Sequence, residues 1–193
     1  MAEALTPASV PGMRKSSAAL AVVLAGVAGC GHGSSDSAPS PGTTGRIAVT
    51  SPAYADGGTI PRRFTCDAED VSPPLALSGV PAHTASLALL LRDSDAAHGT
   101  FTHWLAWDVG PHSTRLTAGE HPPGATEGRN SFGKTGYGGP CPPHGDQPHH
   151  YVLTVYATDR RPSLAPGATP DDLLRALSGH TVATGTLTGR YGR

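Results

Sequence analysis

Gly136-Tyr-Gly-Gly-Pro-Cys-Pro-Pro-His-Gly-Asp-Gln-Pro-His-His-Tyr151 runs directly into the apolar segment Val152–Ala157. The four glycines and four prolines of this stretch exclude a helix or a central strand, because proline lacks a backbone N–H and glycine weakens a strand. The loop brings three polar rings, those of His149, His150 and Tyr151, to the beginning of a strand. A rigid loop that ends in imidazole and phenol groups is typical of a preformed pocket.

Further polar side chains stand at the ends of two other apolar runs. Asp93-Ser94-Asp95 follows the run Leu87–Leu91, and His103 precedes the run Trp104–Val109. Two carboxylates and two or three imidazoles at strand ends indicate a site built where strands and loops meet.

The composition favours a mostly β domain. The chain has 25 glycines and 19 prolines in 193 residues, and short apolar runs recur between turn signals, whereas helical periodicity is scarce. Leu87–Leu91 is apolar on both faces and therefore predicts a central strand. We expect strands at Ile47–Thr50, Ser86–Leu91, Thr102–Val109, Tyr151–Ala157 and Thr181–Thr188, with weaker extended pieces near Arg62–Thr65 and Leu75–Leu77.

One helix is expected near the C-terminus. Thr169 suits the N-cap, Pro170 suits the first helical position, and two aspartates follow at the positive end of the helix dipole. Leu173, Leu174 and Leu177 supply an apolar face, and Gly179 ends the pattern.

The first 45 residues differ from the rest. Arg14-Lys15 precedes a short apolar run ending in Val27-Ala-Gly-Cys30, which resembles the lipobox of bacterial lipoproteins. We therefore expect a signal peptide at residues 1–29, with translation starting at Met1 or Met13, and an acylated Cys30. Residues 30–45 would form the linker, and 46–193 a single exported domain held at the outer face of the cell membrane. An uncleaved buried helix is the alternative.

The cysteines and the net charge limit the classes of protein to which the domain can belong. Cys66 and Cys141 suggest a disulfide in an exported domain, while two free thiols or half of a zinc site remain alternatives. The formal net charge of the chain is −1, and its basic residues are not clustered. The sequence therefore argues against a nucleic-acid-binding protein.

Eight short motifs occur along the exported domain in a fixed order. They are Ile60-Pro61, Phe64–Asp67, Val71–Leu75, Asp93-x-Asp95, His103-Trp104, Gly128-x-Asn130, Gly136–Tyr151 and Gly179-His180. Together they resemble the phosphatidylethanolamine-binding protein family, in particular its bacterial branch of Raf kinase inhibitor-like proteins. The resemblance implies a β-sandwich of a central, largely antiparallel sheet and a smaller sheet, with one or two short helices near the C-terminus and a small anion pocket at one end.

The resemblance also implies the ligand-binding residues, which are Asp93, Asp95, His103, Gly138, Gly139, Pro140, His149 and Tyr151. The chain departs from the family pattern at Ser94, where a proline is usual, and at His150, where an arginine is usual. A histidine there makes anion affinity more dependent on pH.

We expect the two aspartates to hydrogen-bond His103 and His149 and to raise their pKa, so that charged N–H groups and loop N–H groups face an anion. The resulting function is a regulatory binding module without a cofactor, for a small anion or a phospholipid headgroup. An envelope protein or a peptidase is a possible partner, and the family also suggests a homodimer. The alternative is a metal-dependent hydrolase in which Asp93, Asp95, His103 and His149 bind the metal.

Overall fold

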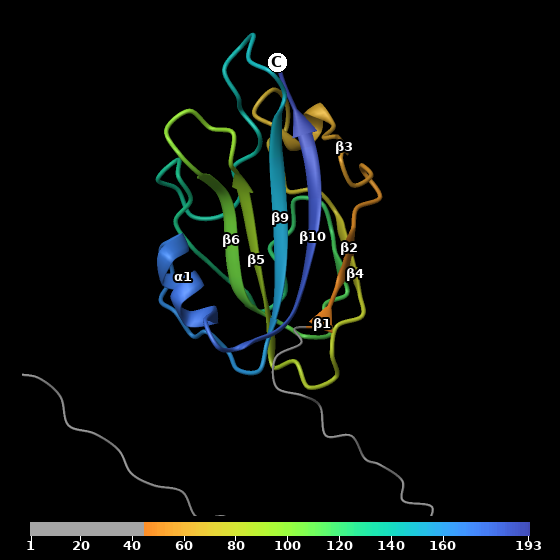
Figure 1. Cartoon of the computed structure of the whole chain (residues 1–193), viewed down its shortest axis with the longest axis vertical. Coiled ribbons are helices and arrows are strands. Elements are labelled where there is room, and N and C mark those ends of the chain that lie inside the picture. Colours follow the sequence, from red (N-terminus) through yellow and green to blue (C-terminus); the bar gives the residue numbers. More distant parts are fainter. Residues whose placement is uncertain (1–44) are drawn as a thin grey trace, which may run out of the picture. The chain divides into compact units, whose positions relative to one another are not determined.

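The computed structural model describes residues 45–193, which form two sheets and two short helical segments (Figure 1). The expected signal peptide (1–29), the expected acylation site Cys30 and all but the last residue of the expected linker (30–45) lie outside the described residues. The strands are β1 (Gly45–Arg46), β2 (Ala48–Thr50), β3 (Gly58–Thr59), β4 (Leu75–Ser78), β5 (Ser86–Asp93), β6 (Phe101–Val109), β7 (Arg115–Leu116), β8 (Thr126–Glu127), β9 (His149–Thr158) and β10 (Thr181–Tyr191); the helices are a 3₁₀ turn, η1 (Arg62–Phe64), and α1 (Pro170–Leu177).

The larger sheet has seven strands in the order β1-β10-β9-β5-β6-β8, and β3 also pairs with β10. The pairs β10·β9, β9·β5, β5·β6 and β6·β8 are antiparallel, whereas β1 and β3 run parallel to β10. The smaller sheet has the order β2-β4-β7. The mostly β sandwich is therefore confirmed, and so is the central position of the strand that contains Leu87–Leu91.

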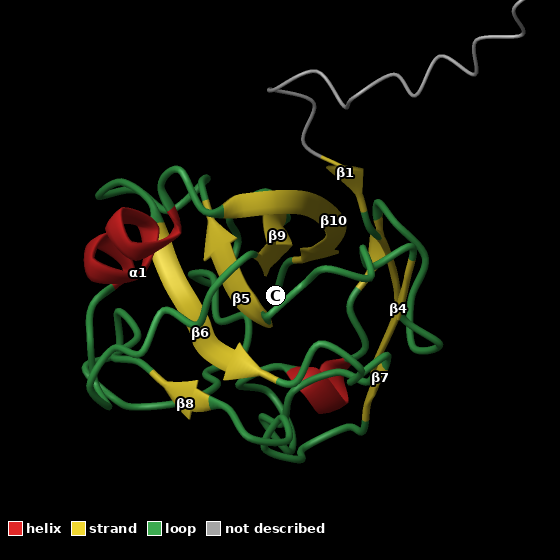
Figure 2. Cartoon of the chain, turned by 90° about the horizontal axis from the view of Figure 1, so that it is seen from below, coloured by secondary structure: helices red, strands yellow, loops and turns green. Residues whose placement is uncertain are grey.

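The two faces of the large sheet are covered by different elements. Figure 2 shows α1 on one side of β5 and β6, and β4 and β7 on the other. The main core lies between the sheets and includes Trp104, Tyr151 and Leu153. A second cluster joins Leu90 and Trp107 of the sheet to α1. Because β5 contributes to both clusters, its apolar residues are buried on both faces.

Helix α1 begins and ends as its sequence predicts. The Thr169 hydroxyl accepts a hydrogen bond from the backbone N–H of Asp172, and the Asp172 carboxylate accepts one from the backbone N–H of Thr169. This reciprocal capping box satisfies two N–H groups that a helix start would otherwise leave free. Leu173 and Leu177 are the buried residues of the helix and dock it on the sheet.

The expectation of an extended piece at Arg62–Thr65 is wrong. Residues Arg62–Phe64 form the 3₁₀ turn η1, in which the backbone N–H of Phe64 donates to Pro61. The side chain of Thr65 adds a bond to the carbonyl of Arg62. These local bonds favour the turn over an isolated extended segment that would have no partner strand. The other weak piece, Leu75–Leu77, is β4, as expected.

Cys66 and Cys141 form a disulfide, with an S–S distance of 2.09 Å and a Cα–Cα distance of 5.4 Å. Of the three interpretations open from sequence, the structure shows the disulfide. It links the segment after η1 to the Gly136–Tyr151 loop. No helix within residues 45–193 is long and apolar enough to cross a bilayer.

Candidate functional site

The ends of three adjacent strands meet at one pole of the sandwich. In the strand register, Asp93 at the end of β5 lies opposite Tyr151 near the start of β9 and opposite Phe101 at the start of β6. Antiparallel neighbours place such pairs within side-chain contact. The strand register therefore brings β9, which is distant in the sequence, beside the ends of β5 and β6.

The alternation of β9 decides which of its polar rings faces inward. Successive side chains of a strand point to opposite faces, and the burial pattern of β9 places His149 and Tyr151 on the core side, with His150 on the other. Tyr151 has no exposed surface, and His149 is also buried. The site thus continues the main core toward the sandwich end.

A bulge in β6 brings His103 to the same side. Leu91 pairs with Trp104 and Arg92 pairs with Thr102, so His103 is an extra residue between these pairs. A bulge of this kind redirects a side chain and often occurs beside functional sites. The ring centroids of His103 and Tyr151 are 5.1 Å apart, in an edge-to-face arrangement.

His103 is held by backbone carbonyls and not by a carboxylate. Its Nδ1 lies 2.8 Å from the carbonyl oxygen of Gly138 and 3.1 Å from that of Gly139. Since a carbonyl only accepts, Nδ1 carries the proton, and Nε2 of the neutral ring is an acceptor. Burial lowers the pKa of His103 below its usual value, despite the opposing effect of these hydrogen bonds and of Asp93. The expectation that carboxylates raise this pKa is wrong, because desolvation outweighs them.

The two aspartates pair with the consecutive histidines of β9. Asp93 Oδ2 is 2.7 Å from Nδ1 of His149, and both side chains are buried. Asp95 Oδ2 is 2.7 Å from Nδ1 of the half-exposed His150 and accepts the backbone N–H of the same residue. These bonds from His150 lower the pKa of Asp95. The predicted Asp–His contact is therefore present for His149, whereas Asp95 contacts His150 instead of His103.

Tyr151 has a hydroxyl group without a partner. This oxygen is buried and makes no hydrogen bond to any residue of the described chain. Burial, followed by the charges of Asp93 and Asp95, raises the pKa of Tyr151 well above its usual value, so the hydroxyl keeps its proton. Buried polar groups are nearly always paired in folded proteins, and an unpaired donor beside a cavity is a ready ligand contact.

These side chains surround one cavity of about 300 Å³. Five of the eight predicted ligand-binding residues line it, and they are Asp93, Asp95, His103, His149 and Tyr151. Asp146, His98, Phe101 and Phe132 also line it and were not predicted. Asp146 lies in the quoted loop three residues before His149, and this spacing was the one sequence signal that could have predicted its place in the cavity. No sequence pattern indicated that Phe101 and Phe132 line the cavity.

The loop contributes to the cavity through other residues than the predicted ones. Before His149 its lining residues are Cys141, Pro142, Pro143 and Asp146, whereas Gly138, Gly139 and Pro140 do not line the cavity. The N–H of Gly138 donates to the carbonyl of His103, and the N–H of Gly139 donates to Asp70. These loop N–H groups are therefore engaged inside the protein, and the backbone of Gly138 and Gly139 positions His103 instead.

A metal site is not formed by these residues. Within residues 45–193 no three His, Cys, Asp or Glu side chains are arranged to hold a metal ion. Asp93 and His149 bind each other, and Nδ1 of His103 is engaged by the loop. The ligand set that the hydrolase alternative requires is thus not assembled in the described part of the chain.

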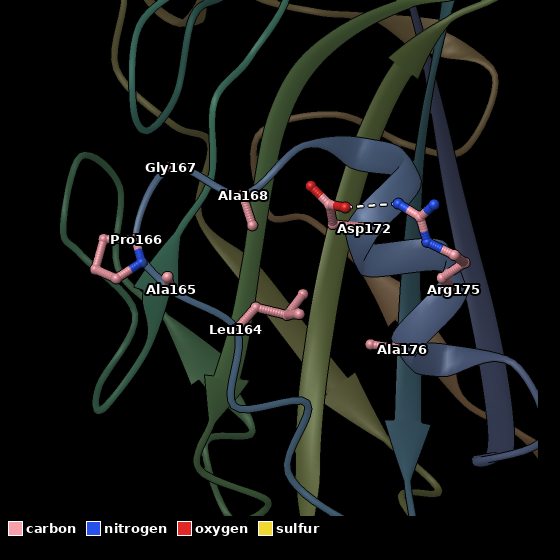
Figure 3. A pocket seen from close by; sticks show the side chains of 8 residues that line it. All are labelled: Leu164, Ala165, Pro166, Gly167, Ala168, Asp172, Arg175 and Ala176. Atoms are coloured by element: carbon pink, nitrogen blue, oxygen red, sulfur yellow. Dashed lines mark hydrogen bonds and ion pairs between the residues drawn. The ribbon is translucent and has the colours of Figure 1, made fainter.

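A larger hollow, of about 670 Å³, lies beside α1 on the other side of the large sheet (Figure 3). Leu164, Ala168 and Ala176 give it an apolar floor. Its two charged residues, Asp172 and Arg175, form an exposed ion pair with each other. This hollow offers no buried polar group to a ligand, so the candidate site is the cavity around Tyr151.

Solved structures of similar fold agree with this architecture. A phosphatidylethanolamine-binding protein homologue from Chlamydia trachomatis superposes with a TM-score of 0.73 at 35% identity, covering 77% of this chain and 98% of that one. YbcL of E. coli, described as a member of the mammalian PEBP family, gives a TM-score of 0.72 at 30% identity, covering 77% and 99%.

Curated sequences give the same result. A UPF0098 protein of Pyrococcus abyssi is 41% identical over 150 residues, which cover 74% of this chain and 84% of the relative. LppC of Mycobacterium tuberculosis, which is named as a lipoprotein, is 38% identical over 191 residues, covering 89% and 94%. The family model for phosphatidylethanolamine-binding protein matches residues 50–192. The chain therefore belongs to the phosphatidylethanolamine-binding protein family.

Proposed function

We propose that the cavity binds a small phosphorylated headgroup that also carries an amine, of the phosphoethanolamine type, and that the protein is a binding module. The observation that carries this proposal is the buried, unpaired hydroxyl of Tyr151 at the cavity. A volume of about 300 Å³ lies at the lower end of ligand pockets and suits a small polar molecule. The name of the family supports the same class of ligand.

The charges around the cavity favour a zwitterion over a simple anion. Asp93, Asp95 and Asp146 line it, whereas no lysine or arginine does. A bare dianion would meet three carboxyl groups and only neutral or titratable donors. A ligand with an ammonium group gives the exposed carboxylates of Asp95 and Asp146 a cationic partner in addition to their histidine contacts, while its phosphate accepts the hydroxyl hydrogen of Tyr151.

Phosphate binding next to His103 also requires one additional proton, either on the ring or on the phosphate. Its Nε2 is an acceptor in the neutral ring, so it contacts a phosphate oxygen only when that oxygen or the ring carries an additional proton. Because the pKa of His103 is lowered, the uncharged form predominates at neutral pH. Affinity for the phosphate group should therefore rise as the pH falls from neutrality, with proton uptake on binding.

Isothermal titration calorimetry with phosphoethanolamine, inorganic phosphate and ethanolamine tests the proposal. We expect phosphoethanolamine to bind more tightly than either fragment, and we expect buffers of different ionisation enthalpy to reveal proton uptake. Mass spectrometry of the recovered ligand should show it unchanged. Equal affinities for phosphate and phosphoethanolamine would reject the role of the carboxylates, and conversion of the ligand would reject a pure binding function.

We further propose that the protein is a lipoprotein anchored through Cys30, facing outside the cytoplasm. The relative named as a lipoprotein aligns over 89% of this chain, so its similarity extends beyond the 50–192 segment matched by the family model. Metabolic labelling with a fatty acid should mark the wild-type protein and not Cys30→Ser. Equal label in both would exclude this residue as the anchor.

A further inference from the structure

Phe132 is the one large hydrophobic side chain of residues 45–193 that is exposed, with 43% of its surface accessible. It also lines the cavity around Tyr151 and therefore stands at the cavity rim. Its ring packs against Phe101, with centroids 4.8 Å apart, and against His103, at 5.4 Å. An aromatic side chain that is exposed at a pocket mouth yet held in place is available for a contact with something outside the chain.

The turn that carries Phe132 is rigid. The buried Asn130 uses its side-chain oxygen to accept the N–H groups of Phe132 and Lys134, and its amide donates to the carbonyl of Gly136. Gly133 has a φ of +78°, which completes the turn. Asn130 thus fixes the tip in a conformation that presents Phe132 and Lys134 to the outside.

Two basic residues belong to the same turn as Phe132. Arg129 and Lys134 are both exposed, and neither forms an ion pair with a residue in the described range. An exposed aromatic side chain and unpaired cations in one short turn suit the interface of a bilayer, where aromatic side chains lie at headgroup level and basic ones meet lipid phosphates. Asp95 and Asp146, which also line the cavity, would face the amine of a lipid headgroup.

The size of the cavity decides between a free and a membrane-bound ligand. About 300 Å³ holds a headgroup but not two acyl chains. For a lipid whose chains stay in the bilayer, the cavity rim must therefore approach the membrane surface. We infer that the tip formed by residues 129–134 docks on a bilayer, with Phe132 entering the headgroup region beside a phospholipid whose headgroup occupies the cavity. This inference rests on the proposed headgroup binding and specifies that the headgroup belongs to a phospholipid of the membrane.

Phe132→Trp tests the docking directly, in a chain that also carries Cys30→Ser so that no lipid anchor contributes. The native Trp104 and Trp107 are 2% and 0% exposed, so lipid can reach only the new indole. We expect vesicles of phosphatidylethanolamine with a minor share of phosphatidylglycerol to shift its emission to the blue, and brominated acyl chains to quench it. The parent chain should show neither effect.

Lys134→Ala tests the electrostatic part without touching the cavity. Removing one cation near an anionic surface should weaken vesicle partition about fivefold, as expected from about 1 kcal/mol per basic residue. The matched control is Arg160→Ala, an exposed cation just after β9, at the opposite end of that strand from His149. It should leave partition unchanged.

Phosphoethanolamine titrations of the same variants separate the two proposals. If soluble headgroup binds but the Phe132→Trp variant stays unquenched on vesicles, docking is wrong and the headgroup site stands, as it would for a tip that contacts a protein. If vesicles quench the variant but soluble headgroup does not bind, docking is supported and the headgroup site fails. If the variant is not quenched and soluble headgroup does not bind, both proposals are wrong. An equal loss of partition for Lys134→Ala and Arg160→Ala would contradict a specific docking face.

Discussion

Replacing Tyr151 by phenylalanine should make the protein more stable and its ligand binding weaker. The hydroxyl is buried without a partner, and leaving such a group unpaired costs about 1–3 kcal/mol. Its ring is fully buried and keeps its packing in the variant. We therefore expect the free energy of unfolding of the unliganded protein to rise by roughly 1 kcal/mol, the lower end of that range.

The same hydroxyl is the proposed donor to the ligand phosphate. Hydrogen bonds to charged groups contribute about 1.5–3 kcal/mol, so affinity for phosphoethanolamine should fall by about one to two orders of magnitude. Urea denaturation measures the first effect, and titration calorimetry measures the second. A gain in stability joined to a loss of binding is the pattern of a residue kept for function.

Two controls isolate the cause. Thr84 carries the other unpaired buried hydroxyl of the described residues and lies next to strand β5 at the end opposite the cavity, so Thr84→Val should stabilise without changing affinity. Tyr191 donates its hydroxyl to Asp67, so Tyr191→Phe should lose stability. If Tyr151→Phe also loses stability, the hydroxyl of Tyr151 is satisfied in the unliganded protein and the reasoning fails. Unchanged affinity would remove Tyr151 from the ligand site.

Three further changes have defined outcomes. Replacing both Cys66 and Cys141 by serine opens a link across 75 residues and should cost about 4 kcal/mol by chain entropy, seen as a lower urea midpoint. Since the pKa of His103 is lowered on folding, the unfolded chain binds the extra proton, so stability falls as pH drops below 6.5; His103→Gln should lose this component in urea titrations at several pH values, and an identical pH profile would refute it. Gly139→Ala places a methyl group 2.5 Å from Asp70 Oδ1 and from the carbonyl oxygen of Phe64, so thermal denaturation should show a lower Tm, and an unchanged Tm would mean that the loop can move away.

The strands that position the site could be predicted because burial determines their sequence. Leu87–Leu91 is apolar on both faces because one face packs in the main core between the sheets and the other packs in the cluster with α1. The two-residue strands, among them β7 and β8, were not predicted, because their pairing is made by backbone groups and leaves no side-chain pattern. The turn η1 was missed for a related reason, since its hydrogen bonds are local and Arg62 and Arg63 remain exposed.

The residues around the cavity were more predictable than their partners. The chain order of Asp93, His103 and Tyr151 placed them at strand ends, and register brought them together. The bulge at His103 depends on how β6 pairs with β5, which no local pattern specifies. Because the bulge could not be predicted from the sequence, the hydrogen bonding of His103 to the loop carbonyls and its lowered pKa could not be predicted either.

The arrangement of the pairs explains how an acidic cavity can still receive a phosphate. Asp93 is engaged by His149, the imidazole of His150 on the far side of β9 binds Asp95, and Asp146 lies 3.8 Å from Nε2 of His149, so each carboxylate of the cavity has a histidine partner. The polar atoms that we expect to meet the phosphate are the hydroxyl of Tyr151 and Nε2 of His103, one a donor and the other an acceptor in the neutral ring. A phosphate that carries a proton matches this donor and acceptor pair, whereas a fully ionised phosphate matches only the donor. The ligand's own protonation thus provides the complement that the protein's charge does not, and this is why affinity should depend on pH even though neither Tyr151 nor the loop backbone titrates near neutrality.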